Sequence, residues 1–425
     1  MNINLILKKQ KESIKLDKEE LNSLKEEVKK VSNFLEEEIA KQGANAEIFM
    51  GGSFAKGTLL KKESYDIDIF VRFDWKFDDI SGLLEKIIER VNSKLNYNLS
   101  KIHGSRDYFK LQRKNVIFEI IPVYKIKKPK EARNVTDLSY FHVNYVKKKL
   151  RKNSINEEIL LAKKFCQAQE VYGAESYIKG FSGYALECLI IQYKSFLKMI
   201  KALSNSKERI VLDPESHYKK KQDILFLLNE NKLQGPIVLV DPTFKERNVL
   251  AALNAETFRK FQESSKRFLK SPSISFFEAK ELDIDRLKNL AEKKSNEFIH
   301  LKIKTDRQSG DIAGSKMKKF ANFLTNTLSK YFDIIEKEFL YSDGQESNFY
   351  LVVKAKKEII LFGPPTVMEK NAKAFKKNHK NIFEKSGKLY AKEKINFNCK
   401  EFLKRYYQEQ KTKIIDMGII DLKQV

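Results

Sequence analysis

The chain has 425 residues, of which 42% are hydrophobic and 33% are charged, a composition typical of a soluble globular protein with several domains. No apolar run approaches the length of a membrane span, so we expect no membrane association, and the charged N-terminal segment lacks the apolar core of a secretory leader. The cysteines are Cys166, Cys188 and Cys399. Their wide spacing argues against a disulfide framework and against a zinc site, and it predicts a reducing cytoplasm as the compartment.

The charge balance is strongly positive. Lysine and arginine number 82 against 57 aspartate and glutamate residues, which gives a net charge of +25. Such an excess predicts an extended polyanionic partner and binding that weakens as salt is added. Heavy use of lysine and isoleucine throughout the chain would also explain part of this charge, so the motifs must decide whether the partner is a nucleic acid.

The first periodic segment is an amphipathic helix over residues 17–42. Apolar residues recur at steps of three and four from Leu21 to Ile39, and Asp17 is a suitable N-cap. The helix ends at Gly43 and leads into a short apolar run. We interpret it as a packing helix and not as a partner site.

The next stretch combines a glycine turn with a pair of carboxylates. Gly52 and Ser53 allow backbone N–H groups to approach phosphate oxygens, and Lys56 adds positive charge nearby. A β-branched and aromatic run then places Asp66 and Asp68 two residues apart, so that in a strand both project from one face. Magnesium bridges phosphates and takes only one or two protein carboxylates, so the two features in this order predict Mg²⁺-assisted nucleotidyl transfer. Either feature alone is more often a simple turn or a polar strand edge.

Glu119 is the one charge in an otherwise apolar strand. A helix over residues 78–95 precedes two strands, at 108–112 and 115–124, and Glu119 lies in the second. A buried carboxylate without a partner costs several kcal/mol, so we expect a cation beside it. Two interpretations remain: a third metal carboxylate beside the aspartate pair, or a salt bridge at a strand edge.

The region after this strand contains weaker signals. The basic segment 125–134 contains a proline and reads as an irregular exit from the first domain. His142 stands among aromatic residues, where a histidine is usually structural. Residues 156–205 read as helices, and Ser182 precedes an apolar helical run, which favours an N-cap over a ligand-binding turn.

Residues 236–253 begin as a buried strand and turn at Asp241-Pro242. The pattern after the turn predicts a helix that begins near Asn248. Arg247 would then lie at the helix start, where a cation opposes the helix dipole. An arginine in that place indicates an anionic or hydrogen-bonding neighbour, although a surface ion pair would also explain it.

Six motifs in this order and spacing resemble the archaeal-type (class I) CCA-adding enzymes, which are tRNA nucleotidyltransferases of the DNA polymerase beta superfamily. The resemblance is strong over the first 260 residues and continues more weakly through Phe362-Gly363-Pro364-Pro365. The motifs are Gly52-Ser53 with Ala55-Lys56-Gly57-Thr58, Asp66-Ile67-Asp68, Ile121-Pro122-Val123-Tyr124, Tyr172-Gly173-Ala174-Glu175, Gly180-Phe181-Ser182-Gly183-Tyr184, and Asp241-Pro242 with Arg247-Asn248-Val249.

The resemblance implies template-independent addition of CCA to the tRNA acceptor end from CTP and ATP, by two-metal magnesium chemistry that releases pyrophosphate. It implies a cytoplasmic protein and allows a homodimer. A poly(A) polymerase or oligoadenylate-type transferase would share the Gly-Ser and Asp-x-Asp motifs but should ignore CTP. A non-catalytic RNA-binding protein on the same scaffold is the third interpretation.

The resemblance also implies roles for individual residues. Asp66 and Asp68 would hold the metal ions, and Glu119 would take the place of a third carboxylate that is commonly aspartate in the family, which can alter rate or metal preference. Arg247 would help to read the Watson–Crick edge of the incoming base. The residues implied near the triphosphate and sugar are Gly52, Ser53, Lys56, His142, Lys163 and Tyr172.

The C-terminal part predicts a second fold. Residues 298–304, 315–331, 334–341 and 348–354 read as strand, helix, strand and strand, an order that suggests a small α/β sheet with an RNA-recognition-like arrangement. A lysine-rich segment with interleaved aromatic residues follows. Such a run is often only a solvated face, but beside a tRNA-extending domain we prefer an RNA phosphate surface. Its candidate residues are Lys370, Lys373, Lys376, Lys377 and Lys380.

We therefore predict an α+β multidomain protein. Residues 1–149 would form a polymerase-beta-like nucleotidyltransferase head, and residues 150–260 a mostly helical central domain for nucleotide recognition. Residues 261–425 would form a C-terminal α/β RNA-binding body with a basic tail.

Overall fold

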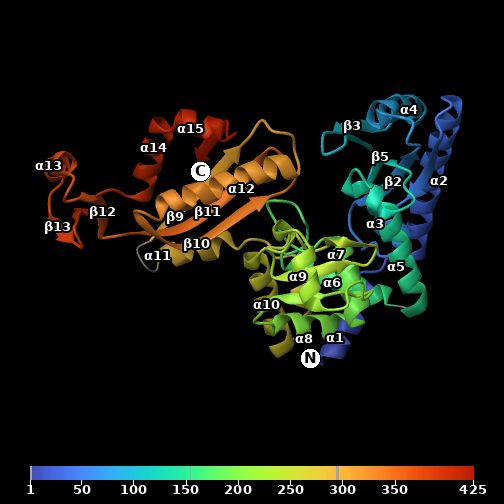
Figure 1. Cartoon of the computed structure of the whole chain (residues 1–425), viewed down its shortest axis with the longest axis horizontal. Coiled ribbons are helices and arrows are strands. Elements are labelled where there is room, and N and C mark those ends of the chain that lie inside the picture. The colour runs from blue at the N-terminus through green and yellow to red at the C-terminus, as the bar shows by residue number, and fades with distance from the viewer. Residues whose placement is uncertain (1, 154, 293–295) are drawn as a thin grey trace. The chain divides into compact units, whose positions relative to one another are not determined.

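A computed structural model describes residues 2–153, 155–292 and 296–425. The chain divides into two compact units, Met1–Lys280 and Glu281–Val425, and both combine helices with sheets (Figure 1). The expected α+β class is therefore confirmed. A bilayer-spanning helix would need a long apolar stretch, and none of the helices in the described ranges has one.

The first unit begins with a head built on a five-stranded sheet. The strand order is β1-β2-β5-β4-β3, and only β2 and β5 run parallel. Two helices, α2 and α4, cover one face of the sheet, where alternate residues of β2 and β5 form the core (Figure 1). The N-terminal helix α1 (Ile3–Ser13) packs with the later helical region. The elements of the head are α2 (Lys18–Lys41), β1 (Ala46–Met50), α3 (Gly52–Lys56), β2 (Tyr65–Phe73), α4 (Ile80–Leu95), β3 (Asn98–Ile102), β4 (Tyr108–Arg113) and β5 (Val116–Tyr124).

These elements confirm the local predictions for the head. The Asp17 side chain accepts the backbone N–H of Glu20 and caps α2, as expected. The predicted helix at 78–95 begins two residues later, at Ile80, because Asp79 is its N-cap. The basic exit at 125–134 contains one short 3₁₀ turn, η1 (Pro129–Glu131), and a second, η2 (Val135–Leu138), follows it.

A mostly helical region completes the first unit. Ser182 caps α7, as predicted, by accepting the N–H of Ala185. The core of this region is dense in phenylalanine: the ring of Phe165 packs between those of Phe196 and Phe268 at centroid distances of 5.3 and 5.9 Å. The elements are α5 (Ser139–Asn153), α6 (Asn156–Ala168), α7 (Gly183–Tyr193), α8 (Phe196–Ser204), β6 (Ile210–Leu212), α9 (Lys221–Leu227), η3 (Glu230–Lys232), β7 (Ile237–Asp241), β8 (Phe244–Asn248), α10 (Ala255–Lys270) and η4 (Ile274–Phe277).

The prediction of a helix that begins near Asn248 is wrong. The chain turns after Asp241, whose carboxylate accepts the backbone N–H of Thr243 at 2.8 Å, and returns as strand β8 paired with β7. Arg247 therefore lies in a strand and not at a helix start. The anionic neighbour that its position suggested is present, because its guanidinium donates to Asp241 at 2.8 Å.

The predicted boundary after residue 260 differs from the edge of the compact unit. Position 260 falls inside α10, and the buried Phe258, Phe261 and Phe268 of this helix belong to one core. The first unit continues to Lys280. The division into three domains stays a prediction.

A buried cluster of charges joins the head to the helical region inside the first unit. Glu187 on α7 is fully buried and accepts Lys56 Nζ from α3 at 2.6 Å and Lys163 Nζ from α6 at 2.9 Å. Thr58, on the segment after α3, donates its hydroxyl to the same carboxylate at 2.8 Å. These contacts fix the glycine turn of the head against two helices of the neighbouring region.

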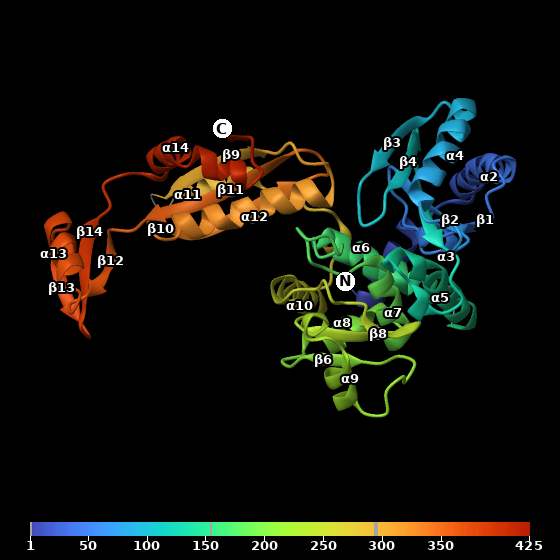
Figure 2. The same cartoon turned by 45° about the horizontal axis from the view of Figure 1, so that its top comes forward.

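The second unit contains two antiparallel sheets. The larger has the order β10-β11-β9-β15, and α12 packs along one of its faces (Figure 2). The expected strand–helix–strand–strand order is confirmed in β9, α12, β10 and β11, whereas β12 enters the smaller sheet, β12-β14-β13. The elements are α11 (Ile284–Glu292), β9 (Glu297–Lys304), α12 (Asp311–Leu328), β10 (Phe332–Tyr341), β11 (Glu346–Ala355), β12 (Glu358–Pro365), α13 (Glu369–Asn378), β13 (Ile382–Lys385), β14 (Lys388–Lys394), α14 (Cys399–Glu409), α15 (Lys411–Asp416) and β15 (Asp421–Gln424).

Removing the charge of Glu187 should destabilise the first unit. Glu187→Gln leaves two buried ammonium groups without their carboxylate, so we expect the free energy of unfolding to fall by about 3–5 kcal/mol at neutral pH. Urea titration followed by the fluorescence of Trp75, the single tryptophan of the chain, measures this change. The matched control is Glu170→Gln, which breaks the exposed pair of Glu170 with Lys260 and should leave the urea midpoint nearly unchanged.

The contribution of Glu187 to stability should depend on pH. Burial by itself would raise the pKa of Glu187, but Lys163 and Lys56 outweigh it and lower the pKa to about 2. A carboxyl group with a depressed pKa in the folded state stabilises the fold above its unfolded pKa, and this contribution is lost as the pH falls. The difference in stability between the wild-type protein and Glu187→Gln should therefore shrink from about pH 5 towards pH 2. A variant as stable as the wild-type protein at neutral pH would contradict the assignment.

Candidate active site

The two aspartates of the head lie on the open face of its sheet. The odd-numbered residues of β2 are buried against α2 and α4, so Asp66 and Asp68 project from the opposite face. Strand β5 lies beside β2 with Asp68 opposite Glu119, and the buried neighbours Phe118 and Ile120 place Glu119 on the same face as the aspartates. The predicted strand periodicity therefore brings all three carboxylates to one face.

The glycine turn lies directly against Asp68. A Cβ atom on Gly52 would lie 1.7 Å from Asp68 Oδ2, and the φ of Gly52 is +59°, so only glycine fits this position. The N–H of Gly51 donates to the backbone carbonyl of Asp68 at 2.9 Å. Ser53 follows within α3. The predicted turn and the predicted aspartate pair are thus in contact.

The carboxylates influence one another electrostatically. Burial, together with the negative charges of Glu119 and Asp66, raises the pKa of Asp68 to about 7, although the charge of Lys56 opposes this increase. Like charges held close together in a buried place favour binding of a cation. The oxygen donors and their shared negative charge fit a divalent metal ion, which needs only one or two protein carboxylates when substrate oxygens complete its shell.

The three carboxylates are not assembled into one coordination shell. Lys62 Nζ lies 2.5 Å from Asp66 Oδ2, and Lys110 Nζ lies 3.1 Å from Glu119 Oε1. Across the part of the chain that the structure describes, no three His, Cys, Asp or Glu side chains converge closely enough to hold a metal ion. The cation expected beside Glu119 is present as Lys110, which is the salt-bridge interpretation of that residue.

Two predicted phosphate-binding lysines share one carboxylate. Lys163 is buried and the Lys56 side chain is 9% exposed, and the ammonium groups of both bind the single carboxylate of Glu187. Burial lowers the pKa of Lys163, and the nearby charge of Lys56 lowers it further, while Glu187 opposes the change. The result is a buried excess of positive charge that would be balanced by an anion.

Tyr172 lies beside this cluster. A Cβ atom added to Gly183, at the start of α7, would lie 3.0 Å from the Tyr172 hydroxyl and 3.7 Å from Lys163 Cε. The backbone of Tyr172 is bridged to that of Phe181. Burial raises the pKa of Tyr172, so its hydroxyl keeps its proton and is available as a donor. The structure therefore brings Lys56, Lys163 and Tyr172 together, and their contacts with a nucleotide stay a prediction.

A second cluster is built around the buried carboxylate of Asp241. It accepts Arg247 Nη1 at 2.8 Å, His142 Nε2 at 3.1 Å and the Tyr184 hydroxyl at 3.1 Å. The imidazole of His142 also stacks on Tyr184, with ring centroids 4.1 Å apart and planes inclined by 24°. Burial lowers the pKa of His142 even though Asp241 opposes the change, so the ring is neutral at neutral pH. The Arg247 side chain remains 26% exposed, compared with 12% for His142.

Sequence reasoning missed the residues that hold these clusters together. Glu187 is a single acid in the apolar run of α7, and the rule applied to Glu119 would have found it, since a buried carboxylate needs a cation. Tyr184 precedes Glu187 by three residues on the same helix. Helix α7 therefore supports the lysine cluster and the Asp241 cluster at positions that lie on one face.

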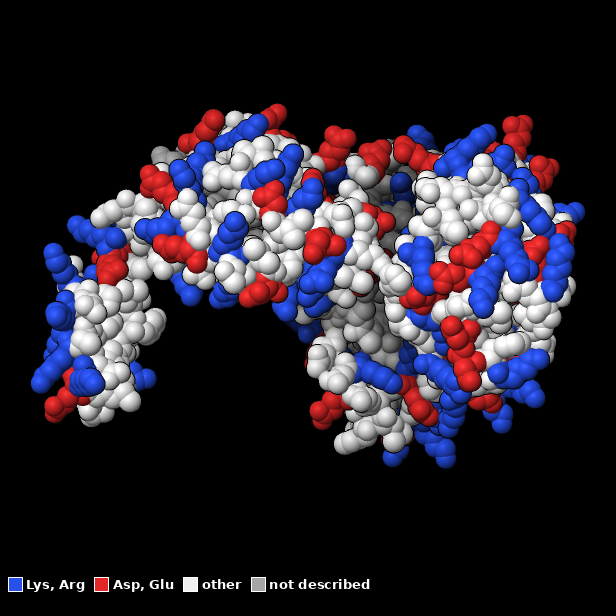
Figure 3. All heavy atoms as spheres, turned by 90° about the horizontal axis from the view of Figure 1, so that it is seen from above, with Lys and Arg blue, Asp and Glu red and all other residues white. Residues whose placement is uncertain are grey.

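The predicted lysine surface belongs to the second unit. Four of its lysines lie on α13 and the fifth follows that helix, and all five side chains are exposed. Lysine and arginine side chains gather along one edge of this part of the chain, at the left of Figure 3. Exposure is what a phosphate-binding surface requires, and the RNA-binding role stays a prediction.

Comparison with known proteins covers both parts of the first unit. Residues 157–278 match the family model described as tRNA nucleotidyltransferase, second domain, and residues 1–139 match the Second Messenger Oligonucleotide or Dinucleotide Synthetase domain. Among solved structures, the poly(U) polymerase Cid1 with Mg and 3′-dATP has a TM-score of 0.51 at 13% identity, over 64% of this chain and 98% of that chain. At this identity the likeness shows a shared nucleotidyltransferase fold only.

Sequence relatives extend over nearly the whole chain. The CCA-adding enzyme of Methanocaldococcus jannaschii is 29% identical over 406 residues, which are 92% of this chain and 87% of that protein. The CCA-adding enzyme of Nanoarchaeum equitans is 30% identical over 394 residues, 92% of this chain and 95% of the relative. Together with the nucleotidyltransferase head and its paired aspartates, this similarity shows that the chain belongs to the family of CCA-adding enzymes.

Proposed function

We propose that the protein adds CCA to the 3′ end of tRNA from CTP and ATP, without a nucleic-acid template, in a Mg²⁺-dependent nucleotidyl transfer that releases pyrophosphate. One observation carries the proposal: the carboxylate face of β2 lies directly against a glycine turn that ends in a buried lysine cluster. Negative charge for a metal and positive charge for a triphosphate thus adjoin. Nucleotidyl transfer to a hydroxyl needs both.

The carboxylates are proposed to hold the metal. Asp66 and Asp68 would be the main ligands, and Glu119 would join them once Lys110 releases it. Bound magnesium would supply Lewis acidity to the triphosphate and to the attacking hydroxyl. We also propose that Glu119 takes up the proton of the tRNA 3′ hydroxyl, a role supported by the position of its carboxylate on the same face as the aspartates.

The lysine cluster is proposed to hold the triphosphate. Lys56 and Lys163 give an excess of positive charge, and the hydroxyl of Tyr172 adds a neutral donor. The backbone of Gly52 and the hydroxyl of Ser53 lie on the same turn as Lys56. Glu187 positions both ammonium groups and limits their excess charge, so that leaving pyrophosphate is not retained.

The Asp241 cluster is proposed to read the base. Asp241 engages one terminal nitrogen of Arg247, which leaves the remaining guanidinium donors free to face a ligand. Cytosine and adenine both present an unprotonated ring nitrogen on the Watson–Crick edge, whereas uracil and guanine present a ring N–H there. A fixed arginine N–H group can therefore donate a hydrogen bond to C and to A, whereas in U and G it would face another donor. His142 would contact the sugar or phosphate from the same cluster.

The remaining proposals concern partners and compartment. The exposed lysines of α13, with Lys380, would follow the phosphate backbone of tRNA. We propose that the protein is cytoplasmic, where its three free cysteines would stay reduced. It would act as a monomer or as a homodimer.

The function is tested by extending a tRNA transcript that lacks its last three nucleotides. Each labelled NTP is offered alone, and then CTP with ATP, in Mg²⁺, and the products are sized on a gel. Two additions with CTP and a third that needs ATP are expected. A ladder with ATP alone would identify a poly(A)-type polymerase instead. Failure to extend with any nucleotide, despite tight tRNA binding, would indicate a non-catalytic RNA-binding protein.

Asp66→Ala should abolish extension and leave tRNA binding nearly intact. Loss of a metal-binding carboxylate removes several kcal/mol of transition-state stabilisation, so we expect the rate to fall by about a thousandfold or more. Single-turnover extension and filter binding of tRNA measure the two effects. Asp78→Ala, at an exposed aspartate before α4, is the control and should keep full activity. Turnover that survives in Asp66→Ala would disprove the metal assignment.

Arg247→Ala should change the choice of nucleotide more than the rate. Loss of the base-reading donor should reduce the preference for CTP over UTP by about ten- to a hundredfold, with a smaller loss in the rate with CTP. The ratio of kcat/KM values for the two nucleotides measures the effect. Arg259→Ala, at an exposed arginine of α10, is the matched control. If both variants discriminate as well as the wild-type protein does, Arg247 does not read the base.

A further inference from the structure

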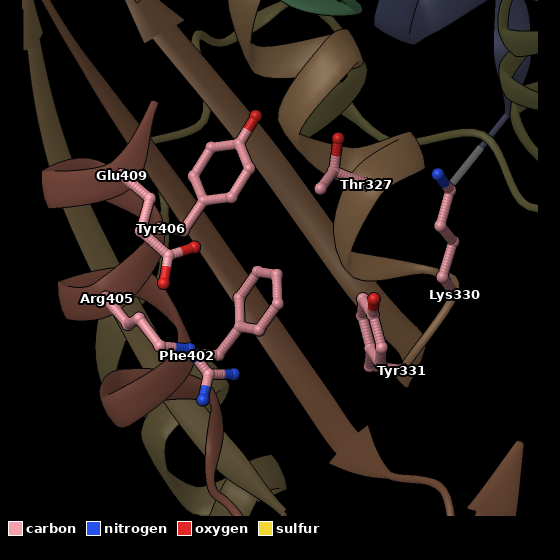
Figure 4. A pocket seen from close by; sticks show the side chains of 7 residues that line it. All are labelled: Thr327, Lys330, Tyr331, Phe402, Arg405, Tyr406 and Glu409. Carbon is pink, nitrogen blue, oxygen red and sulfur yellow. The ribbon is translucent and has the colours of Figure 1, made fainter. Parts of the chain in front are cut away.

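The second unit contains a pocket that none of the residues discussed above lines. It has a volume of about 320 Å³ and lies between the end of α12 and the side of α14 (Figure 4). This volume is at the lower end of the range for small-ligand pockets, about 300–1,000 Å³, so it suits a ligand of one or two rings. The lining residues are Thr327, Lys330, Tyr331, Phe402, Arg405, Tyr406 and Glu409.

Aromatic rings form the floor of the pocket. Phe402 is 7% exposed and fixed in the core, with its ring centroid 5.1 Å from that of Tyr331 and 5.7 Å from that of Tyr406. In Figure 4, the three rings come from both sides of the pocket and point into the space between α12 and α14. Tyr331 and Tyr406 are only partly buried, so they can offer ring faces to a ligand.

Two cationic side chains lie at the rim of the pocket. Lys330 and Arg405 are exposed, and neither forms an ion pair within the described ranges. The guanidinium of Arg405 lies 5.2 Å from the ring centroid of Phe397, outside the pocket lining, which orients the side chain without neutralising it. Glu409 supplies one acceptor. The pocket therefore combines stacking surfaces, an excess of positive charge and a single carboxylate.

We propose that this pocket binds one unstacked nucleotide. Its base would stack on the ring of Tyr331 or of Tyr406, above the buried Phe402, and its phosphate would lie between Lys330 and Arg405. Aromatic floors that accept splayed-out bases and cations that accept phosphates are the usual means of single-stranded nucleic-acid binding. Glu409 would accept an exocyclic amino group or a ribose hydroxyl. The pocket is distinct from the candidate active site, whose residues all belong to the first unit.

The same chemistry occurs in two ligands. One is an unpaired nucleotide within a bound RNA, and the other is a free nucleoside phosphate. The net charge of +25 favours the RNA, because a polyanion adds long-range attraction that a mononucleotide lacks. This preference rests on the proposed function, whereas the pocket and its nucleotide chemistry do not.

The full-length protein is tested with RNA and with mononucleotide. Filter binding of a tRNA transcript at several salt concentrations compares the wild-type protein with Arg405→Gln and Lys330→Gln. The matched control is Lys404→Gln, an exposed lysine of α14 outside the pocket. Each pocket variant should weaken binding about three- to tenfold and reduce the salt slope by about 0.7, as expected for one lost phosphate contact to a single strand. The control should change binding by less than about twofold.

A second arm tests the aromatic floor without a substitution. tRNA that carries 4-thiouridine at unpaired positions is irradiated with the wild-type protein, and crosslinked peptides are mapped by mass spectrometry. Crosslinks to Tyr331, Phe402 or Tyr406 are expected. A third arm titrates the same proteins with AMP and CMP by calorimetry. One site fewer in Arg405→Gln than in Lys404→Gln would identify the free nucleotide as the ligand.

The outcomes separate the two proposals. RNA binding that is equally strong in Arg405→Gln and Lys404→Gln, with no crosslink to the three rings and no lost mononucleotide site, would overturn the pocket proposal whatever the extension assay gives. A wild-type protein that binds RNA through this pocket but extends no tRNA would overturn the proposed function and leave the pocket proposal standing.

Discussion

The shared carboxylate of Glu187 is the interaction on which the architecture of the first unit depends. Lys56 reaches it from the glycine turn of the head and Lys163 from α6, so a single buried anion fixes two cations from separate elements. Burying charges is costly unless they are paired and hydrogen bonded, and the hydroxyl of Thr58 completes the pairing. Because alternative arrangements would leave a buried charge unpaired, the cluster holds the turn in one position relative to the helices.

Helix α7 connects this constraint to the second cluster. Tyr184 and Glu187 are three residues apart, so the same face of the helix bonds to Asp241 and to the lysines. The carboxylate of Asp68 on β2 adjoins the glycine turn, because Gly52 lies directly against it. Lys56 at the end of the turn is near enough to oppose the increase in the pKa of Asp68. In the proposed function, the carboxylates would hold the metal and the lysine cluster would hold the phosphates.

The charged residues of the second unit are arranged differently. Its larger sheet has a core on one face, covered by α12 and α14, and its charged residues remain at the surface. The rings of Tyr331 and Phe402 pack together between these two helices. The charged side chains of Lys330, Arg405 and Glu409 line the pocket beside them. Exposed lysines suit a long polyanion, because each phosphate contact adds a modest and salt-dependent contribution. The first unit also has exposed charges, but it buries Lys163, Glu187 and Asp241 within two polar clusters, an arrangement that suits a small ligand held in one geometry.

The sequence by itself determined the local elements and the chemistry. The three- and four-residue spacing of apolar residues predicted α2, and the two-residue spacing in β2 predicted that Asp66 and Asp68 share a face. The cost of a buried charge predicted a cation at Glu119, found as Lys110. Only the tertiary structure decided that β8 is a strand, because its pairing with β7 outweighs local preference. It alone showed Glu187 with its partners, 131 and 24 residues away in the chain. Periodicity reports which face of an element is buried, whereas ion pairs between distant segments depend on how the elements pack, which no local pattern contains.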